Sequence, residues 1–126
     1  MKGIGIVGYG YWGPKLVRNF LHASGVRAVA VCDESPERCA RAQKDFPGLQ
    51  TFTSYEALLK DPGFEAIALA TPPATHHPLA KRALESGHHV LVEKPLTHSL
   101  ATARELIALA EKLGRVLMVD HTFLYH

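Results

Sequence analysis

Short apolar runs of strand length alternate with segments of helical periodicity along the whole chain. Most of these runs are apolar at almost every position, which is typical of parallel strands that are covered on both faces. Short connections join each run to the next helical segment, so the pattern predicts a doubly wound α/β fold with about six parallel strands. The expected strands are residues 4–7, 26–31, 49–52, 65–70, 89–92 and 115–119.

Several helical segments begin or end at residues that cap helices. Pro14 fits the first turn of the helix after the first strand, and Ser35 and Ser54 occupy N-cap positions. Gly87 and Gly114 stand where a glycine ends a helix. The helices with the clearest ends are expected at 54–60, 74–86 and 99–113.

Length and composition fit one domain over residues 1–126, without a linker, repeat or low-complexity tract. The net charge of +2, with scattered Lys and Arg, disfavours nucleic acid or a membrane surface as partner. No apolar run approaches the ~18 residues of a membrane span, and the N-terminus lacks the pattern of a signal peptide. Two cysteines are too few for a disulfide framework, so a reduced, cytoplasmic setting is expected.

The stretch "GIVGYGYWGPKL" carries a G-x-G-x-x-G array at Gly8, Gly10 and Gly13. It leaves an apolar run and enters a helical one, and Asp33 follows Gly13 by 20 residues at the end of the second expected strand. In this fingerprint the first glycine permits a tight turn, the second admits a pyrophosphate and the third lets the helix pack on the strand. An acidic residue in the place of Asp33 binds the adenosine ribose hydroxyls and repels a 2′-phosphate. The array therefore predicts a dinucleotide site that prefers NAD to NADP.

A glycine-rich first turn also occurs outside dinucleotide sites. The array could be only a turn beside a surface aspartate. A nucleotide-hydrolysing P-loop requires G-K-[ST], which Gly13-Pro14-Lys15 does not supply. A methyltransferase that binds S-adenosylmethionine can share the glycines and the acidic residue, but the motifs that follow disfavour it.

Two further motifs, "ATPPATHHPLA" (70–80) and "VLVEKPLTHS" (90–99), lie just past the ends of expected strands. Together with "GYGYWG" they resemble the nucleotide-binding half of the glucose–fructose oxidoreductase/inositol dehydrogenase/MocA family, which has an NAD(P)-binding Rossmann fold. The final "VDHTFLYH" is similar to the branch that acts on nucleotide sugars, such as UDP-N-acetylglucosamine 3-dehydrogenases. The resemblance implies an oxidoreductase that moves hydride between a nicotinamide and a sugar or nucleotide-sugar hydroxyl.

The resemblance also implies roles for single residues. Lys94 would be the catalytic lysine, which binds the reacting hydroxyl and helps to pass its proton, with Glu93 beside it under the nicotinamide. His76 would lie near the nicotinamide ribose, and Tyr11 and Trp12 would cover the pyrophosphate turn. The full set of expected cofactor-binding residues is Gly8, Gly10, Tyr11, Trp12, Gly13, Asp33, Thr71, Pro72, Pro73, His76, Glu93 and Lys94.

The remaining candidate residues fit simpler roles. The histidine pairs at 76–77 and 88–89 lack a third ligand at metal-type spacing, so no metal site is expected. His121 either points into the same cleft or is only a strand-end residue. An aromatic in the place of Trp12 is more often a packing residue than a contact with substrate, and Cys32 is expected to be a small buried hydrophobe.

Members of the family carry a second α/β domain after the sixth strand, and this sequence stops where that domain would begin. Three hypotheses follow: the cofactor domain of a sugar oxidoreductase, a stand-alone NAD-binding sensor or subunit, and an inactive scaffold. Catalysis requires an oriented, water-excluded site, so the isolated chain is expected to turn over poorly. An apolar surface near the strand ends and around 123–125 is expected to drive self-association unless a second domain covers it.

Overall fold

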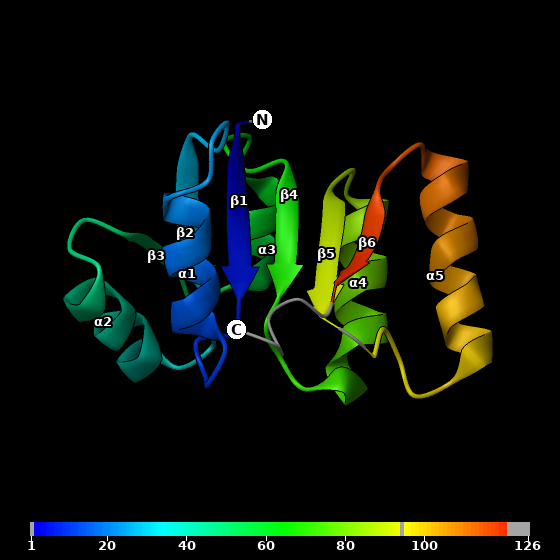
Figure 1. Ribbon diagram of the computed structural model, residues 1–126, viewed down its shortest axis with the longest axis horizontal. Coiled ribbons are helices and arrows are strands. Elements are labelled where there is room, and N and C mark those ends of the chain that lie inside the picture. The colour runs from blue at the N-terminus through cyan, green and yellow to red at the C-terminus, as the bar shows by residue number, and fades with distance from the viewer. Residues whose placement is uncertain (1, 94, 121–126) are drawn as a thin grey trace.

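The computed structural model describes residues 2–93 and 95–120 and forms a parallel sheet flanked by helices (Figure 1). The strands are β1 (Gly3–Val7), β2 (Ala28–Cys32), β3 (Gln50–Phe52), β4 (Ala66–Leu69), β5 (His89–Glu93) and β6 (Leu117–Asp120). The helices are α1 (Gly13–Leu21), α2 (Pro36–Asp45), α3 (Tyr55–Lys60), the 3₁₀ turn η1 (Pro73–Thr75), α4 (His76–Glu85) and α5 (Leu100–Leu113). The expected doubly wound α/β fold is confirmed.

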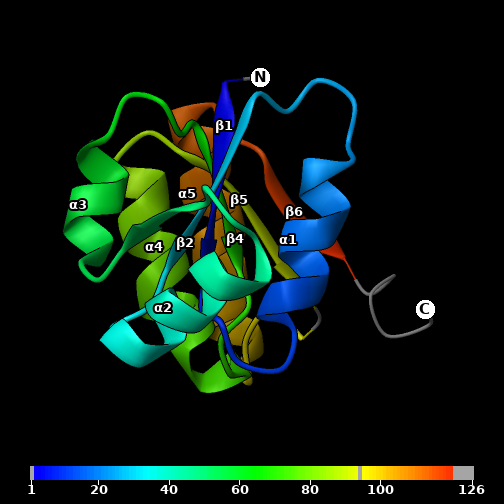
Figure 2. The ribbon, with the colours of Figure 1, turned by 90° about the vertical axis from the view of Figure 1, so that its left-hand side faces the viewer.

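The sheet has the strand order β3-β2-β1-β4-β5-β6, and all five neighbouring pairs are parallel. The chain winds outward from β1 to β3 and then returns to the other side of β1 to build β4, β5 and β6. This reversal places α1 and α2 on one face of the sheet and α3, α4 and α5 on the other. Figure 2 shows α1 on the opposite side of the sheet from α3 and α4. In open α/β sheets, ligands bind at the carboxyl ends of the two strands between which the order reverses. Here those strands are β1 and β4.

The core consists of two apolar layers, one on each face of the sheet. All residues of β1 and β4 are buried, because these central strands are covered by helices on both faces. This double burial explains why the corresponding runs of the sequence are continuously apolar. The largest side chains that are fully buried are Tyr9, Ile6, Leu58, Ile67, Leu69, Leu84 and Leu106.

The helix ends follow the sequence closely. The hydroxyls of Ser35 and Ser54 accept hydrogen bonds from backbone N–H groups three residues further on, as N-caps do. Gly114 ends α5 in the left-handed conformation, with φ of 65°. The expected helix from residue 74 instead starts at His76, after a 3₁₀ turn that begins at Pro73. In the ranges that the structure describes, no helix has the length and apolarity to cross a bilayer.

Candidate functional site

A cavity of about 750 Å³ opens at the carboxyl ends of β1 and β4, where the strand order reverses. Residues of the three sequence motifs meet in its walls, although they lie far apart in the chain. Gly13 packs behind the cavity rather than lining it, and Lys94 lies outside the described residues. The sequence-predicted residues that line it are Gly8, Gly10, Tyr11, Trp12, Asp33, Thr71, Pro72, Pro73, His76 and Glu93.

The three positions of the first turn require glycine for different structural reasons. Gly8 has φ of +100°, and a Cβ there would lie 2.9 Å from Cγ2 of Thr71. A Cβ on Gly13 would lie 2.6 Å from the carbonyl oxygen of Gly8, so this glycine allows α1 to approach the turn. A Cβ on Gly10 would meet nothing within 4 Å, and Gly10 lines the cavity. Gly8 and Gly13 are therefore required by the fold, whereas Gly10 leaves room for a ligand.

The N-terminus of α1 faces this turn and suits an anion. Trp12 is the N-cap residue, its side chain caps no backbone N–H group, and the first turn of α1 has no acidic residue. Uncapped N–H groups and the helix dipole both favour negative charge at this point. The ammonium group of Lys15 adds a positive charge nearby, 4.7 Å from the centre of the Trp12 ring. The turn and the helix start together fit the pyrophosphate of a dinucleotide.

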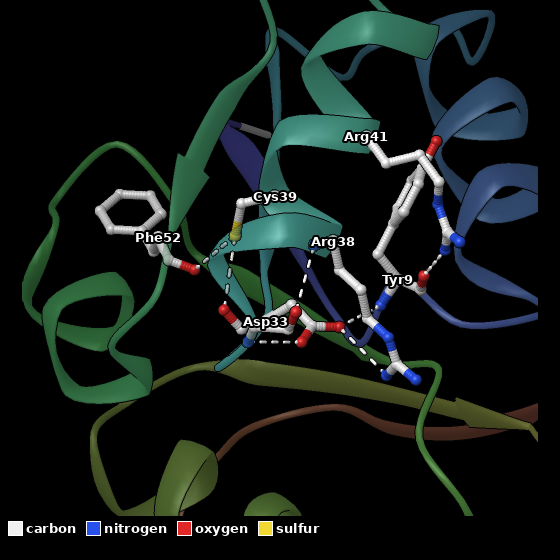
Figure 3. A network of polar contacts seen from close by, with 7 residues as sticks. Tyr9, Asp33, Arg38, Cys39, Arg41 and Phe52 are labelled. Atoms are coloured by element: carbon white, nitrogen blue, oxygen red, sulfur yellow. Dashed lines mark hydrogen bonds and ion pairs between the residues drawn. The ribbon is translucent and has the colours of Figure 1, made fainter.

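Asp33 follows β2 and faces the glycine turn (Figure 3). One carboxylate oxygen accepts a hydrogen bond from the backbone N–H of Tyr9, and the other accepts one from that of Ser35, both at 2.9 Å. The guanidinium group of Arg38 lies 3.6 Å from the carboxylate. An ionised carboxylate offers about four acceptor positions. Asp33 therefore fixes the turn and keeps acceptor capacity for ligand hydroxyls.

Tyr9, the residue between the first two glycines, anchors the turn to α2 (Figure 3). Its side chain is fully buried, and its hydroxyl donates a hydrogen bond to Asp45 at 2.6 Å. The guanidinium of Arg41 lies 5.2 Å from the centre of its ring and donates a hydrogen bond to its backbone carbonyl. Burial, followed by the hydrogen bond to Asp45, raises the pKa of Tyr9 above its usual value. Sequence reasoning missed this network, because the only signal was an aromatic residue in a turn of glycines.

Two further titratable side chains, Cys32 and Tyr55, line the cavity near β2 and α3. Burial raises the pKa of the Cys32 thiol to about 12, so the thiol stays protonated at neutral pH. Its exposed fraction of 3% confirms the expected small buried hydrophobe. Tyr55 donates its hydroxyl hydrogen to the carbonyl of Leu79 at 2.7 Å, and burial raises its pKa.

The opposite wall joins the loops that follow β4 and β5. His76 lines the cavity, but backbone carbonyls face both of its ring nitrogens. Nε2 lies 2.9 Å from the carbonyl oxygen of Thr71, and Nδ1 lies 3.1 Å from those of Pro95 and Leu96. Glu93, at the end of β5, lines the same wall. The expected place of His76 beside a nicotinamide ribose stays a prediction.

The other three histidines of the two pairs, His77, His88 and His89, are not among the residues that line the cavity. Nε2 of His77 lies 3.2 Å from Glu105, and Nδ1 of His89 accepts the backbone N–H of Val116 at 2.9 Å. His88 is buried at the far end of α4, and this burial lowers its pKa. The described part of the chain contains no group of three or more side chains placed to hold a metal ion. The expectations for His121 and for residues 123–125 lie outside the described residues.

Comparisons with known proteins agree with this geometry. The model of the oxidoreductase family with an NAD-binding Rossmann fold matches residues 2–121. The uncharacterized oxidoreductase YdgJ of Escherichia coli K12 is 42% identical over 94% of this chain and 34% of its own length. A dTDP-3,4-didehydro-2,6-dideoxy-alpha-D-glucose 3-reductase of Streptomyces antibioticus is 41% identical over 80% of this chain and 30% of its own length.

The structure is also similar to solved structures. A biliverdin reductase from Synechocystis, solved with biliverdin and NADP+, has a TM-score of 0.88 and 31% identity over 98% of this chain and 39% of its own. The chain thus spans about a third of the length of these relatives. The matched family has an NAD-binding Rossmann fold, whereas this neighbour was solved with NADP+, so similarity alone does not indicate which dinucleotide the chain prefers. The residues that follow β2 bear on this preference.

Proposed function

This chain belongs to the oxidoreductase family with an NAD-binding Rossmann fold, and from this premise we propose that it is the NAD-preferring cofactor domain of a sugar or nucleotide-sugar oxidoreductase. The observation that carries the proposal is the cavity at the ends of β1 and β4, into which Gly10 leaves open space. The start of α1 supplies the positive end of a helix dipole at the same place.

The preference for NAD rests on Asp33. Its side chain is 8% exposed and held by two backbone N–H groups, so it cannot turn away from an incoming 2′-phosphate without losing both hydrogen bonds. A carboxylate fixed in this way repels a phosphate and accepts hydrogen bonds from ribose hydroxyls. Arg38 opposes this preference, because its exposed guanidinium lies beside the carboxylate and can pair with a phosphate.

The proposed chemistry is the oxidation of a carbinol, or its reverse. A bound dinucleotide would supply the hydride acceptor, and the hydroxyl proton would then require an acceptor on the protein. Lys94, which follows Glu93 directly in the sequence, is the proposed acceptor. A sugar or nucleotide sugar as substrate is supported by the similarity to the Streptomyces antibioticus 3-reductase, whose name gives a dTDP-linked sugar as its substrate.

We expect the isolated chain to bind the cofactor but to turn over substrate poorly. Tyr11, at the rim of the cavity, is 76% exposed, so this side of the site is open to water. Hydride transfer requires an oriented pair of reactants from which water is excluded. Self-association is part of the same proposal, because Met118 and Val119 on the edge strand β6 are 53% and 44% exposed.

The proposal is tested by loading the chain with NAD+ and adding a panel of free sugars and nucleotide sugars, while nicotinamide reduction is followed by absorbance. We expect saturable cofactor binding and turnover that is slow but abolished by Lys94→Met. A chain that binds no dinucleotide would contradict the proposal, and so would rapid turnover that survives Lys94→Met. Light scattering of the same sample over a range of concentrations tests self-association, and a monomer at every concentration would contradict that part.

A further inference from the structure

His76 lines the cavity, but its ring nitrogens point to the backbone of two loops. Its side chain is 2% exposed, and both ring nitrogens face backbone carbonyl oxygens. Two of these carbonyls, those of Pro95 and Leu96, belong to the loop after β5, and the third, that of Thr71, belongs to the loop after β4. The ring therefore bridges two loops that are separated in the sequence by the whole of α4 and β5.

The chemistry of the partners defines what the ring does. A carbonyl oxygen can only accept hydrogen bonds, so His76 can hydrogen-bond to either loop only as a donor. A neutral imidazole donates to one of the two loops, and a protonated imidazole donates to both. In either state the ring nitrogens are directed to the backbone, which leaves no ring nitrogen aimed at a ligand in the cavity.

Both bridged loops adjoin residues that line the cavity. Thr71 lines it and also lies against the turn at Gly8, where a Cβ would come within 2.9 Å of its methyl group. Pro95 and Leu96 follow closely after Glu93, which lines the same wall as His76. Holding the two carbonyls after residue 94 near Thr71 therefore fixes how the loop after β5 lies against the loop after β4 in this wall.

We propose that His76 is a positioning residue, which holds Thr71 and Glu93 in place in one wall of the cofactor cavity by tying the backbone of Pro95–Leu96 to that of Thr71. This inference rests on the proposed function, because it assigns His76 a role in the same cofactor site. The role differs from direct contact with the nicotinamide ribose. The proposal predicts that a side chain able to donate a hydrogen bond preserves cofactor binding in part, whereas an apolar side chain of similar volume does not.

The test compares three variants of the same chain with a matched control. His76→Asn places an amide donor near the position of Nδ1, and His76→Gln places one near the position of Nε2. His76→Leu removes both donors and keeps an apolar volume. The control is His77→Leu, because the adjacent histidine contacts Glu105 on α5 and not the two loops.

Two quantities are measured: amide hydrogen exchange at Leu96 and Thr97 without cofactor, and the Kd for NADH. We expect His76→Leu to speed exchange at both amides and to raise the Kd at least about tenfold, because the carbonyls around the buried ring lose their donor. We expect His76→Asn, which keeps the link to the loop after β5, to exchange slowly and to bind within about threefold of the native chain. The control is expected to match the native chain in both measurements.

Unchanged exchange in His76→Leu would overturn the proposal, as would equal losses in the asparagine, glutamine and leucine variants. If the leucine variant fails to fold, long-range proton–nitrogen spectra of the native chain decide instead. Ring N–H protons that are protected from water support the bridge, and rapidly exchanging ring protons overturn it. If the native chain binds no NADH while loop exchange still responds to His76→Leu, the proposed function fails and the bridge stands.

Discussion

The glycines of the first turn allow folding to be separated from cofactor binding. In Gly10→Ala the new Cβ meets no protein atom within 4 Å, and the φ angle of Gly10 is not in the left-handed region. Alanine at such a position restricts the unfolded chain, so we expect the free energy of unfolding to stay equal or rise by about 0.4–1 kcal/mol. The same methyl group enters the space through which a pyrophosphate would approach. We expect binding to weaken by roughly 1–3 kcal/mol, which is about five- to 150-fold in the Kd for NADH.

Gly13→Ala is the contrasting variant. Its Cβ would lie 2.6 Å from the carbonyl oxygen of Gly8 and 3.1 Å from the ring of Tyr9, which is itself fully buried. Neither neighbour is the free end of a flexible side chain, so α1 must shift away from the turn. We expect the free energy of unfolding to fall by about 1–3 kcal/mol, the usual cost of overpacking a core.

Urea unfolding and NADH fluorescence titration of the native chain and both variants provide the test. We expect opposite orders in the two assays: Gly10→Ala is at least as stable as the native chain but binds NADH weakly, whereas Gly13→Ala is the least stable. Native-like NADH binding by Gly10→Ala would refute the reasoning. A loss of stability in Gly10→Ala as large as that in Gly13→Ala would refute it too, because the open space beside Gly10 would then belong to the fold.

Two further predictions concern stability. Tyr9→Phe removes the hydroxyl that donates to Asp45, so the free energy of unfolding measured in urea should fall by about 1 kcal/mol. An unchanged free energy of unfolding would show that this hydrogen bond makes no net contribution to stability. Burial lowers the pKa of His88 below its usual 6.5, so the unfolded chain binds more protons below that pH. The contribution of His88 to the free energy of unfolding should therefore be fully present above pH 6.5 and decrease as the pH falls below it. In His88→Gln the free energy of unfolding should decrease less steeply over the same pH range. An equally steep decline in the variant would contradict the assignment.

The strands, the helix caps and the glycine turn could be predicted from the sequence because each depends on local chemistry. Continuous apolar runs indicate strands buried on both faces, and Ser35 and Ser54 cap the helices that the sequence predicts. Asp33 could be placed at the cofactor site because the fingerprint fixes its distance from the glycines. The strand order, which places the ends of β1 and β4 side by side, could not be predicted in this way, because no local signal in the sequence shows where the chain reverses.

The contacts that position the site could not be predicted, because they depend on how helices and loops pack. Tyr9 meets Arg41 and Asp45 only once α2 lies beside the first turn, and no spacing rule relates these residues. His76 illustrates the same limit. The sequence places it near the cofactor, but the direction of its ring nitrogens is set by two loop conformations that no periodicity records.

The most direct test of the central claim is a parallel titration of the native chain and Asp33→Ala with NADH and NADPH, followed by nicotinamide fluorescence. We expect the native chain to bind NADH more tightly than NADPH, because the fixed Asp33 carboxylate accepts ribose hydroxyls and repels a 2′-phosphate. In Asp33→Ala, NADH should bind more weakly and the preference should narrow or reverse, since Arg38 then faces the phosphate without its carboxylate neighbour. Tighter binding of NADPH by the native chain, or no binding of either dinucleotide, would contradict the claim.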